Sequence, residues 1–350
     1  MLPLSVNNHN GHRPAAQSGP HLRSTKACDH EWVNRQVRRP SPDDVAAAWE
    51  VIRPALTPTP VDATAGPRLL LKLESLQPTG SFKVRGALNA LAAVGPDVRV
   101  VAASAGNHGL GVAYAATLLG RHATVVVPEN ASRAKIAALG EFPVRLERAG
   151  QSYDEAEAYA LELAADDGNY FLSAYNDPFV IGGQGTIGCE LADQVDGEIT
   201  VVCGAGGGGL ASGLGLWASG AGGGGARVVA VETEESTALS VAVAAGGVVP
   251  VTVGATLADG LAGNLEPGSV TVDVVRDHVA ALITVTEGEI ASAIRYLVSA
   301  HGIVAEGSGA APVAAVLAGK VPGDGGQVVA VISGRNITAA ALASILAPPG

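Results

Sequence analysis

Residues 71–87, LKLESLQPTGSFKVRGA, combine residue types that could make an amine reactive. An apolar run expected to be a strand leads into a turn rich in Pro, Thr, Gly and Ser, and Lys83 then follows Phe82 at the expected start of a helix. A lysine amine that is removed from water has a lowered pKa and can form a Schiff base with an aldehyde. An arbitrary lysine at a helix start is more often simply exposed to solvent, so this segment alone leaves both interpretations open.

A second polar turn, ASAGNHG at 103–109, follows an expected strand at 98–102 and opens an expected helix. Backbone amides at a helix start favour an anion, so this turn could bind a carboxylate. His108 could also act as a general base, because histidine titrates near neutral pH, but a backbone contact is the favoured interpretation.

A glycine run follows the expected strand at 199–203, in the sequence TVVCGAGGGGL at 200–210. Successive glycines let several amides point into one concavity, which together with a helix start suits a phosphate. The alternatives are a plain turn and a dinucleotide site, but no acidic residue stands in a convincing ribose position. A second run at 221–225 has no strand leading directly into it and is interpreted as a flexible connection.

Two further turns lie near the end of the chain. Residues 306–309 read EGSG, and Ser333-Gly334-Arg335-Asn336 follows an expected strand at 328–332. With the three motifs above, in this order, they resemble the fold-type II pyridoxal-phosphate enzymes, specifically the threonine dehydratase and serine racemase family. The resemblance extends from about Thr57 to Ile337.

The resemblance implies that pyridoxal 5'-phosphate is the cofactor and that Lys83 forms the Schiff base with it. It places Asn107 at the cofactor's phenolic oxygen, the glycine run at its phosphate and Ser333 at its pyridine nitrogen. The implied cofactor contacts are Phe82, Lys83, Asn107, Gly206, Gly207, Gly208, Gly209, Glu306 and Ser333. The implied substrate contacts are Ser104, Ala105, Gly106, Asn107 and His108.

Three positions refine this resemblance. Ala105 stands where similar serine racemases have the serine that protonates the second face of the carbanion, so elimination is favoured over racemisation. Arg335 replaces a glycine, and its side chain is either exposed or in contact with the cofactor edge or a second substrate carboxylate. Glu232 matches one carboxylate of a pair that holds Mg²⁺ or Ca²⁺ in some relatives; the second position is Ala238, although Glu234 or Glu235 could substitute.

The elements that would position these residues form an α/β pattern. Short apolar runs alternate with helical segments, which is typical of parallel strands covered on both faces and of a doubly wound fold. Helices are expected from Pro42 after the cap Ser41, over 132–139, and from the capping box Thr286/Glu289 to Gly302. The expected strands are 69–73, 98–102, 123–127, 144–146, 199–203, 228–231, 281–285 and 328–332.

The family resemblance implies a tryptophan synthase β-like fold, with the cofactor between two doubly wound α/β domains. We expect a disordered arm at 1–40, a large domain at 41–89 and 178–348, and a small domain at 90–177 that closes over the substrate. The chain ends soon after Asn336, so no appended regulatory domain is expected.

Composition narrows the class of protein. A net charge of −11 argues against a nucleic-acid partner, and no apolar run approaches the ~18 residues that a membrane span needs. The three cysteines are scattered, as in reduced cytoplasmic proteins, and the N-terminus lacks the apolar core of a signal peptide.

The predicted function is elimination of water and ammonia from L-threonine or L-serine by a cytoplasmic homodimer or higher homo-oligomer. Dehydration of 3-hydroxyaspartate and amino-acid racemisation are the alternatives within the family. A cysteine-synthase-like replacement is disfavoured because residues 104–108 do not match its Thr-Ser-Gly-Asn-Thr loop. A non-catalytic cofactor-binding protein is disfavoured because Lys83, Asn107, the glycine run and Ser333 are all present.

Overall fold

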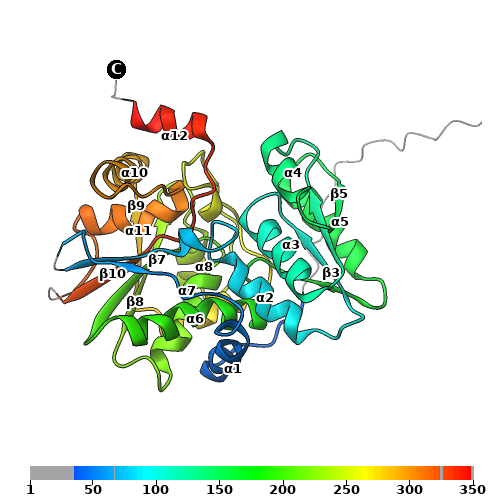
Figure 1. Cartoon of the computed structure of the whole chain (residues 1–350), viewed down its shortest axis with the longest axis horizontal. Coiled ribbons are helices and arrows are strands. Elements are labelled where there is room, and N and C mark those ends of the chain that lie inside the picture. Colours follow the sequence, from blue (N-terminus) through cyan, green and yellow to red (C-terminus); the bar gives the residue numbers. More distant parts are fainter. Residues whose placement is uncertain (1–34, 67, 324–325, 348–350) are drawn as a thin grey trace, which may run out of the picture. The chain divides into compact units, whose positions relative to one another are not determined.

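The strands of the protein form two sheets, which a computed structural model describes over residues 35–66, 68–323 and 326–347 (Figure 1). The six-stranded sheet has the order β1-β2-β10-β7-β8-β9 and the four-stranded sheet the order β5-β4-β3-β6. Among these strands only β1 pairs antiparallel, with β2. The strands are β1 Val61–Asp62, β2 Leu69–Lys72, β3 Arg99–Ala103, β4 Ala123–Val127, β5 Arg145–Arg148, β6 Asn169–Phe171, β7 Ile199–Gly204, β8 Arg227–Thr233, β9 Ala281–Val285 and β10 Gln327–Val331.

Helices connect the parallel strands, so the predicted α/β class is confirmed. The helical elements are α1 Pro42–Ile52, α2 Lys83–Ala93, α3 Asn107–Leu119, α4 Arg133–Leu139, α5 Tyr153–Ala164, α6 Pro178–Gln194, α7 Gly209–Ser219, α8 Ala238–Ala245, α9 Thr271–His278, α10 Glu287–His301, α11 Gly307–Leu317 and α12 Ala339–Leu346, with 3-10 turns η1 Glu74–Leu76 and η2 Asp259–Leu261. No helix of the described residues combines the length and the apolar character that crossing a membrane requires.

Both sheets are covered on both faces. In β7, Val201 and Cys203 enter one apolar cluster and Val202 enters another, and in β3 the clusters alternate in the same way. Successive side chains of a strand point to opposite faces, so two clusters for each sheet mean two covering layers. This burial explains why the strand sequences are continuous apolar runs rather than alternating ones.

The predicted strands and caps are confirmed with small shifts. β4 and β9 have the predicted bounds, and the other six predicted strands differ by one or two residues at either end. Thr286 and Glu289 form the capping box of α10, and Gly302 ends that helix at φ 64°. Two strands were not predicted, β1 and β6, because each has only two or three residues and includes a polar one.

Helix α2, which begins at Lys83, packs against α3 on one side and α6 on the other (Figure 1). Both neighbours matter to the site, because α3 opens with Asn107 and α6 follows the segment after β6. The start of α2 therefore lies where elements of the two sheets meet.

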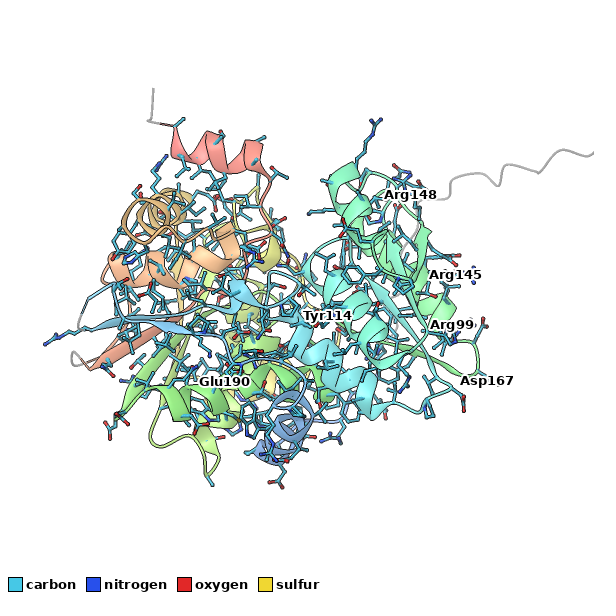
Figure 2. The ribbon with its side chains drawn as sticks, in the orientation of Figure 1. Arg99, Tyr114, Arg145, Arg148, Asp167 and Glu190 are labelled. Atoms are coloured by element: carbon cyan, nitrogen blue, oxygen red, sulfur yellow. The ribbon has the colours of Figure 1, made fainter. Side chains whose placement is uncertain are left out.

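Four buried charges hold α2 in this place. Arg85 of α2 donates to Glu74 of η1 with Nη2–Oε1 2.7 Å, and the same nitrogen lies 2.7 Å from Oε1 of Glu190. Lys72 of β2 reaches the other oxygen of Glu190 at 2.5 Å; Glu190 belongs to α6 and is labelled in Figure 2. All four side chains are at most 1% exposed, so each charge depends on its partners instead of water.

Residues 35–40, at the end of the predicted arm, have no regular structure but are held by ion pairs. Arg35 lies 3.7 Å from Glu266, Arg38 bonds Asp44 and Arg39 bonds Asp277. The rest of the predicted arm, residues 1–34, lies outside the described part of the chain.

Candidate active site

Lys83 presents its amine at the start of α2. The Nζ atom donates to the carbonyl oxygen of Ala174 at 2.8 Å and lies 5.2 Å from the centroid of the Phe82 ring. Burial lowers the pKa of Lys83 to about 8, against the opposing effect of the Glu306 carboxylate. A larger fraction of this amine is therefore uncharged near neutral pH than of an ordinary lysine.

The turn after β10 pairs with the segment before Lys83. The amide of Phe82 donates to the carbonyl of Ser333 at 3.0 Å, and the amide of Arg335 donates to the carbonyl of Gly80 at 2.9 Å. Ser333 is buried, and its hydroxyl makes only a long contact, 3.5 Å, to the carbonyl of Ser308. The structure thus places the hydroxyl predicted for the pyridine nitrogen in the turn that pairs with the lysine segment.

Three amide and carboxylate side chains meet beside this turn. Asn107 donates from Nδ2 to Oε1 of Glu306 at 2.6 Å, and Asn336 donates from Nδ2 to Oδ1 of Asn107 at 2.6 Å. Burial raises the pKa of Glu306 to about 7, although the Asn107 amide opposes this rise. A Cβ on Gly334 would lie 2.1 Å from Oε1 of Glu306, so a side chain at residue 334 would displace this carboxylate.

The glycine run has the geometry of an anion cradle. Within the described chain, the backbone amides of Gly206, Gly207 and Gly208 donate no hydrogen bond, and they precede the start of α7. Gly208 has φ +84°, and a Cβ on Gly207 would lie 2.3 Å from the ring of Tyr175. Free amides at a helix start, in a turn that admits no side chains, suit a phosphate.

Ser104 and His108 of the turn at 103–109 are both hydrogen-bonded to backbone groups. The Ser104 hydroxyl accepts the amide of Gly106 at 3.1 Å, so it is engaged within its own turn. Nε2 of His108 donates to the carbonyl of Leu172 at 3.0 Å, and burial lowers the pKa of His108 to about 3. A neutral, engaged ring fits the predicted backbone contact and not a general base.

Two other candidates, Arg335 and Glu232, are hydrogen-bonded to backbone groups. The guanidinium of Arg335 donates to the backbone carbonyl of Ser75. Glu232 is buried, and its carboxylate accepts the amides of Leu239 and Ser240 at 2.9 and 3.1 Å, so it caps the first turn of α8. No group of three or more His, Cys, Asp or Glu side chains suited to a metal occurs among the residues that the structure describes. The expected cation at Glu232 gains no support from this geometry.

Residues that the sequence analysis did not single out also belong to the site. Tyr175 covers the glycine run, and its hydroxyl accepts the amide of Glu266 at 2.6 Å. Its neighbour Ala174 accepts the hydrogen bond from Lys83. Both follow β6, the short strand whose sequence gave no clear pattern. Asn336 was noted only as the end of a turn, although its amide contacts Asn107.

The residues present fit pyridoxal phosphate. The free backbone amides of the glycine run suit the phosphate. The Lys83 amine, with its lowered pKa, suits the aldehyde. The buried hydroxyl of Ser308, whose carbonyl is contacted by the Ser333 hydroxyl, has no hydrogen-bond partner in the described chain. An unpaired buried hydroxyl is costly unless a ligand completes it.

A family model described as "Pyridoxal-phosphate dependent enzyme" matches residues 52–334 of this chain. The chain belongs to this family. The L-threonine ammonia-lyase of Thermotoga maritima is 40% identical to this pyridoxal-phosphate-dependent enzyme over 276 residues, which cover 78% of this chain and 68% of the relative. L-threonine dehydratase catabolic TdcB of Staphylococcus aureus is 35% identical over 308 residues, which cover 84% of this chain and 88% of the relative.

Solved structures agree with these sequence relatives. Maize serine racemase superposes on the pyridoxal-phosphate-dependent enzyme with a TM-score of 0.79 and 30% identity, covering 88% of this chain and 97% of that one. The processed threonine deaminase isoform 2 of Solanum lycopersicum superposes with a TM-score of 0.78 and 27% sequence identity, covering 92% of this chain and 92% of that one. The predicted family and the fold-type II architecture are therefore confirmed.

Proposed function

We propose that this enzyme eliminates water and ammonia from L-threonine or L-serine and so forms a 2-oxo acid. The observation that carries the proposal is the 40% identity, over most of both chains, to an L-threonine ammonia-lyase. The site supports it, because Asn107 donates to Glu306, whose own amide donates to the carbonyl of Gly334 beside Ser333. The amide of Phe82, next to Lys83, donates to the carbonyl of Ser333.

In this proposal the residues of the site hold the two ends of the cofactor. Gly206, Gly207, Gly208 and Gly209 bind its phosphate, and Ser333 bonds its pyridine nitrogen. Asn107 bonds its phenolic oxygen, while Phe82 and Glu306 line its ring and Lys83 holds its aldehyde carbon. When bound, pyridoxal phosphate withdraws electrons from the Cα atom of an amino acid.

The chain itself then binds the substrate and moves one proton. Amides at the start of α3, with Ser104 and Gly106 beside them, bind the substrate carboxylate. The Lys83 amine accepts the Cα proton, a role that suits its pKa of about 8. Overall, the Cα hydrogen and the β-hydroxyl leave as one water molecule. Hydrolysis of the released enamine consumes one water molecule and gives the 2-oxo acid and ammonia.

Elimination, not racemisation, follows from the turn at 103–109. Racemisation needs a proton donor on the second face of the substrate carbanion, and Ala105 carries none. The adjacent Ser104 hydroxyl accepts the amide of Gly106 and is directed into its own turn. We infer that protonation on that face is slow compared with loss of the hydroxyl.

Three wider statements belong to the proposal. The part that carries the four-stranded sheet, about 90–177, closes over the substrate as a small domain. The remaining parts, 41–89 and 178–348, act as the large domain. We also infer a homodimer or higher oligomer in the cytoplasm.

A substrate panel tests the proposed function. With L-threonine or L-serine, the cofactor-loaded enzyme should release one ammonia for each 2-oxo acid formed. Lys83→Ala should abolish the reaction of both substrates. Chiral chromatography of the unreacted serine should find little D-serine. Faster accumulation of D-serine than of pyruvate would identify a racemase instead.

The panel also separates the dicarboxylate alternative. Since Arg335 already donates to the Ser75 carbonyl, Arg335→Gly should change the rates on threonine and on 3-hydroxyaspartate in parallel. A selective loss of activity on 3-hydroxyaspartate would instead assign Arg335 to the substrate pocket.

A further inference from the structure

Asn336 stands at the end of the turn after β10 and makes two hydrogen bonds through one nitrogen. Its Nδ2 donates to the carbonyl of Thr79 at 2.9 Å and to Oδ1 of Asn107 at 2.6 Å. We infer that Asn336 is a positioning residue that fixes the orientation of the Asn107 carboxamide toward the cofactor. This inference rests on the proposed function, in which Asn107 bonds the phenolic oxygen.

The donors and acceptors around the two carboxamides fix their orientations. A carboxamide nitrogen donates two hydrogens and accepts none, and the oxygen only accepts. Both partners of Asn336 are acceptors, so its nitrogen must face them, and the oxygen of Asn107 must face Asn336. The nitrogen of Asn107 is thereby turned to the other side, where it donates to Glu306 at 2.6 Å.

Without Asn336, nothing described would oppose a rotation of the Asn107 carboxamide by half a turn, apart from Glu306 itself. The rotated amide would present its oxygen to a carboxylate and to the electron-rich oxygen of the cofactor. The oxygen of Asn107, an acceptor, would then face acceptors where its nitrogen now donates. This arrangement is less favourable in free energy than the loss of one hydrogen bond.

Gly80 provides the space for Asn336. Its φ is +75°, and an added Cβ would lie 2.5 Å from Oδ1 of Asn336, with Asn336 atoms as its three nearest neighbours. A side chain at residue 80 would therefore displace Asn336 before it reached anything else. A substitution at Gly80 should therefore change the orientation of Asn107 through Asn336.

The cofactor-loaded enzyme offers a matched set of variants. Asn336→Asp keeps the shape but removes both donated hydrogens, and Asn336→Ala removes the side chain. Gly80→Ala displaces it. Gly168→Ala is the control, because Gly168 has a similar φ of +83° and nothing within 4 Å of an added Cβ. It imposes the same backbone strain without touching the site.

We expect Asn336→Ala, Asn336→Asp and Gly80→Ala each to lower kcat by about tenfold, and to shift the visible absorbance of the bound cofactor. KM should change less than kcat, because the substrate carboxylate site is intact. Gly168→Ala should lower only the melting temperature. In a double-mutant cycle, Gly80→Ala added to Asn336→Ala should cost no more activity than Gly168→Ala does.

Fully additive effects of Gly80→Ala and Asn336→Ala would overturn the inference, and so would a parent-like spectrum and kcat in Asn336→Asp. The absorbance shift is measured without substrate. It therefore tests Asn336 even if the parent enzyme fails to consume threonine or serine, an outcome that would remove the proposed function alone.

Discussion

At the scale of single residues, burial brings the acid and the base of the site closer together. The pKa of Lys83 falls to about 8 and that of Glu306 rises to about 7, in both cases chiefly through removal from water. Ordinary lysine and glutamate differ by about six pKa units, so this pair differs far less. A small difference lets protons move near neutral pH without a large energetic cost.

The pH dependence of cofactor loading should report the Lys83 amine. Only the uncharged amine attacks an aldehyde, so the rate at which the apoenzyme gains visible absorbance should rise with pH and level off above about 8. In the parent, the Glu306 carboxylate raises the pKa of Lys83. Glu306→Gln removes this charge and should therefore move the midpoint to lower pH. A midpoint near 10 in the parent would contradict the burial of the amine.

Ser333→Ala tests the hydroxyl at the pyridine end. Cofactor should remain bound, because the glycine run and Lys83 are unchanged, but kcat should fall about tenfold if the transition state loses ~1.4 kcal/mol. Ser333→Thr, which keeps the hydroxyl, is the conservative comparison. Unchanged kinetics in Ser333→Ala would assign the pyridine nitrogen to another residue.

Removal of divalent cations tests Glu232. Both of its oxygens accept backbone amides of α8, so EDTA should leave activity and melting temperature unchanged. Glu232→Ala should lower the stability by ~1 kcal/mol through loss of the helix cap, with or without EDTA. Inactivation by EDTA with recovery on Mg²⁺ or Ca²⁺ would restore the predicted cation site.

At the scale of elements, the sequence predicts those site residues that follow strands with a clear apolar run. Asn107, Gly206 and Ser333 each stand just after a long apolar run, and the carboxyl ends of parallel strands bring such residues together. Tyr175 and Ala174 follow β6, a three-residue strand without an apolar pattern, so no local signal marked them. The contact between Asn336 and Asn107 joins residues 229 positions apart, which spacing within a motif cannot reveal.

The buried charges around α2 should dominate its stability. Glu74→Ala leaves the Arg85 guanidinium without its bidentate partner in a fully buried site, so unfolding by urea should show a loss of ~3–5 kcal/mol. Glu50→Ala breaks the exposed pair with Arg53 and should cost less than ~1 kcal/mol. Equal losses in the two variants would mean that water reaches the Glu74 site.

At the scale of the whole molecule, the exposed ion pair of Lys135 and Asp259, 3.6 Å apart, joins α4 to η2. If the small domain closes, α4 should become less accessible. L-Alanine, which lacks a β-hydroxyl, should slow tryptic cleavage after Arg133 and Lys135, but not after the exposed Arg276 of α9. L-Lactate, which lacks the amine, should protect none of them. Equal protection at all three sites would indicate general stabilisation instead of closure.

The order of strands in the larger sheet also bears on how the chain is made. β10, the latest of the described strands in sequence, lies between β2 and β7 and pairs with both. During translation, β2 and β7 leave the ribosome long before the strand that joins them, and each keeps an unpaired apolar edge meanwhile. The yield of folded enzyme should therefore depend on chaperones that shield the nascent chain until β10 emerges.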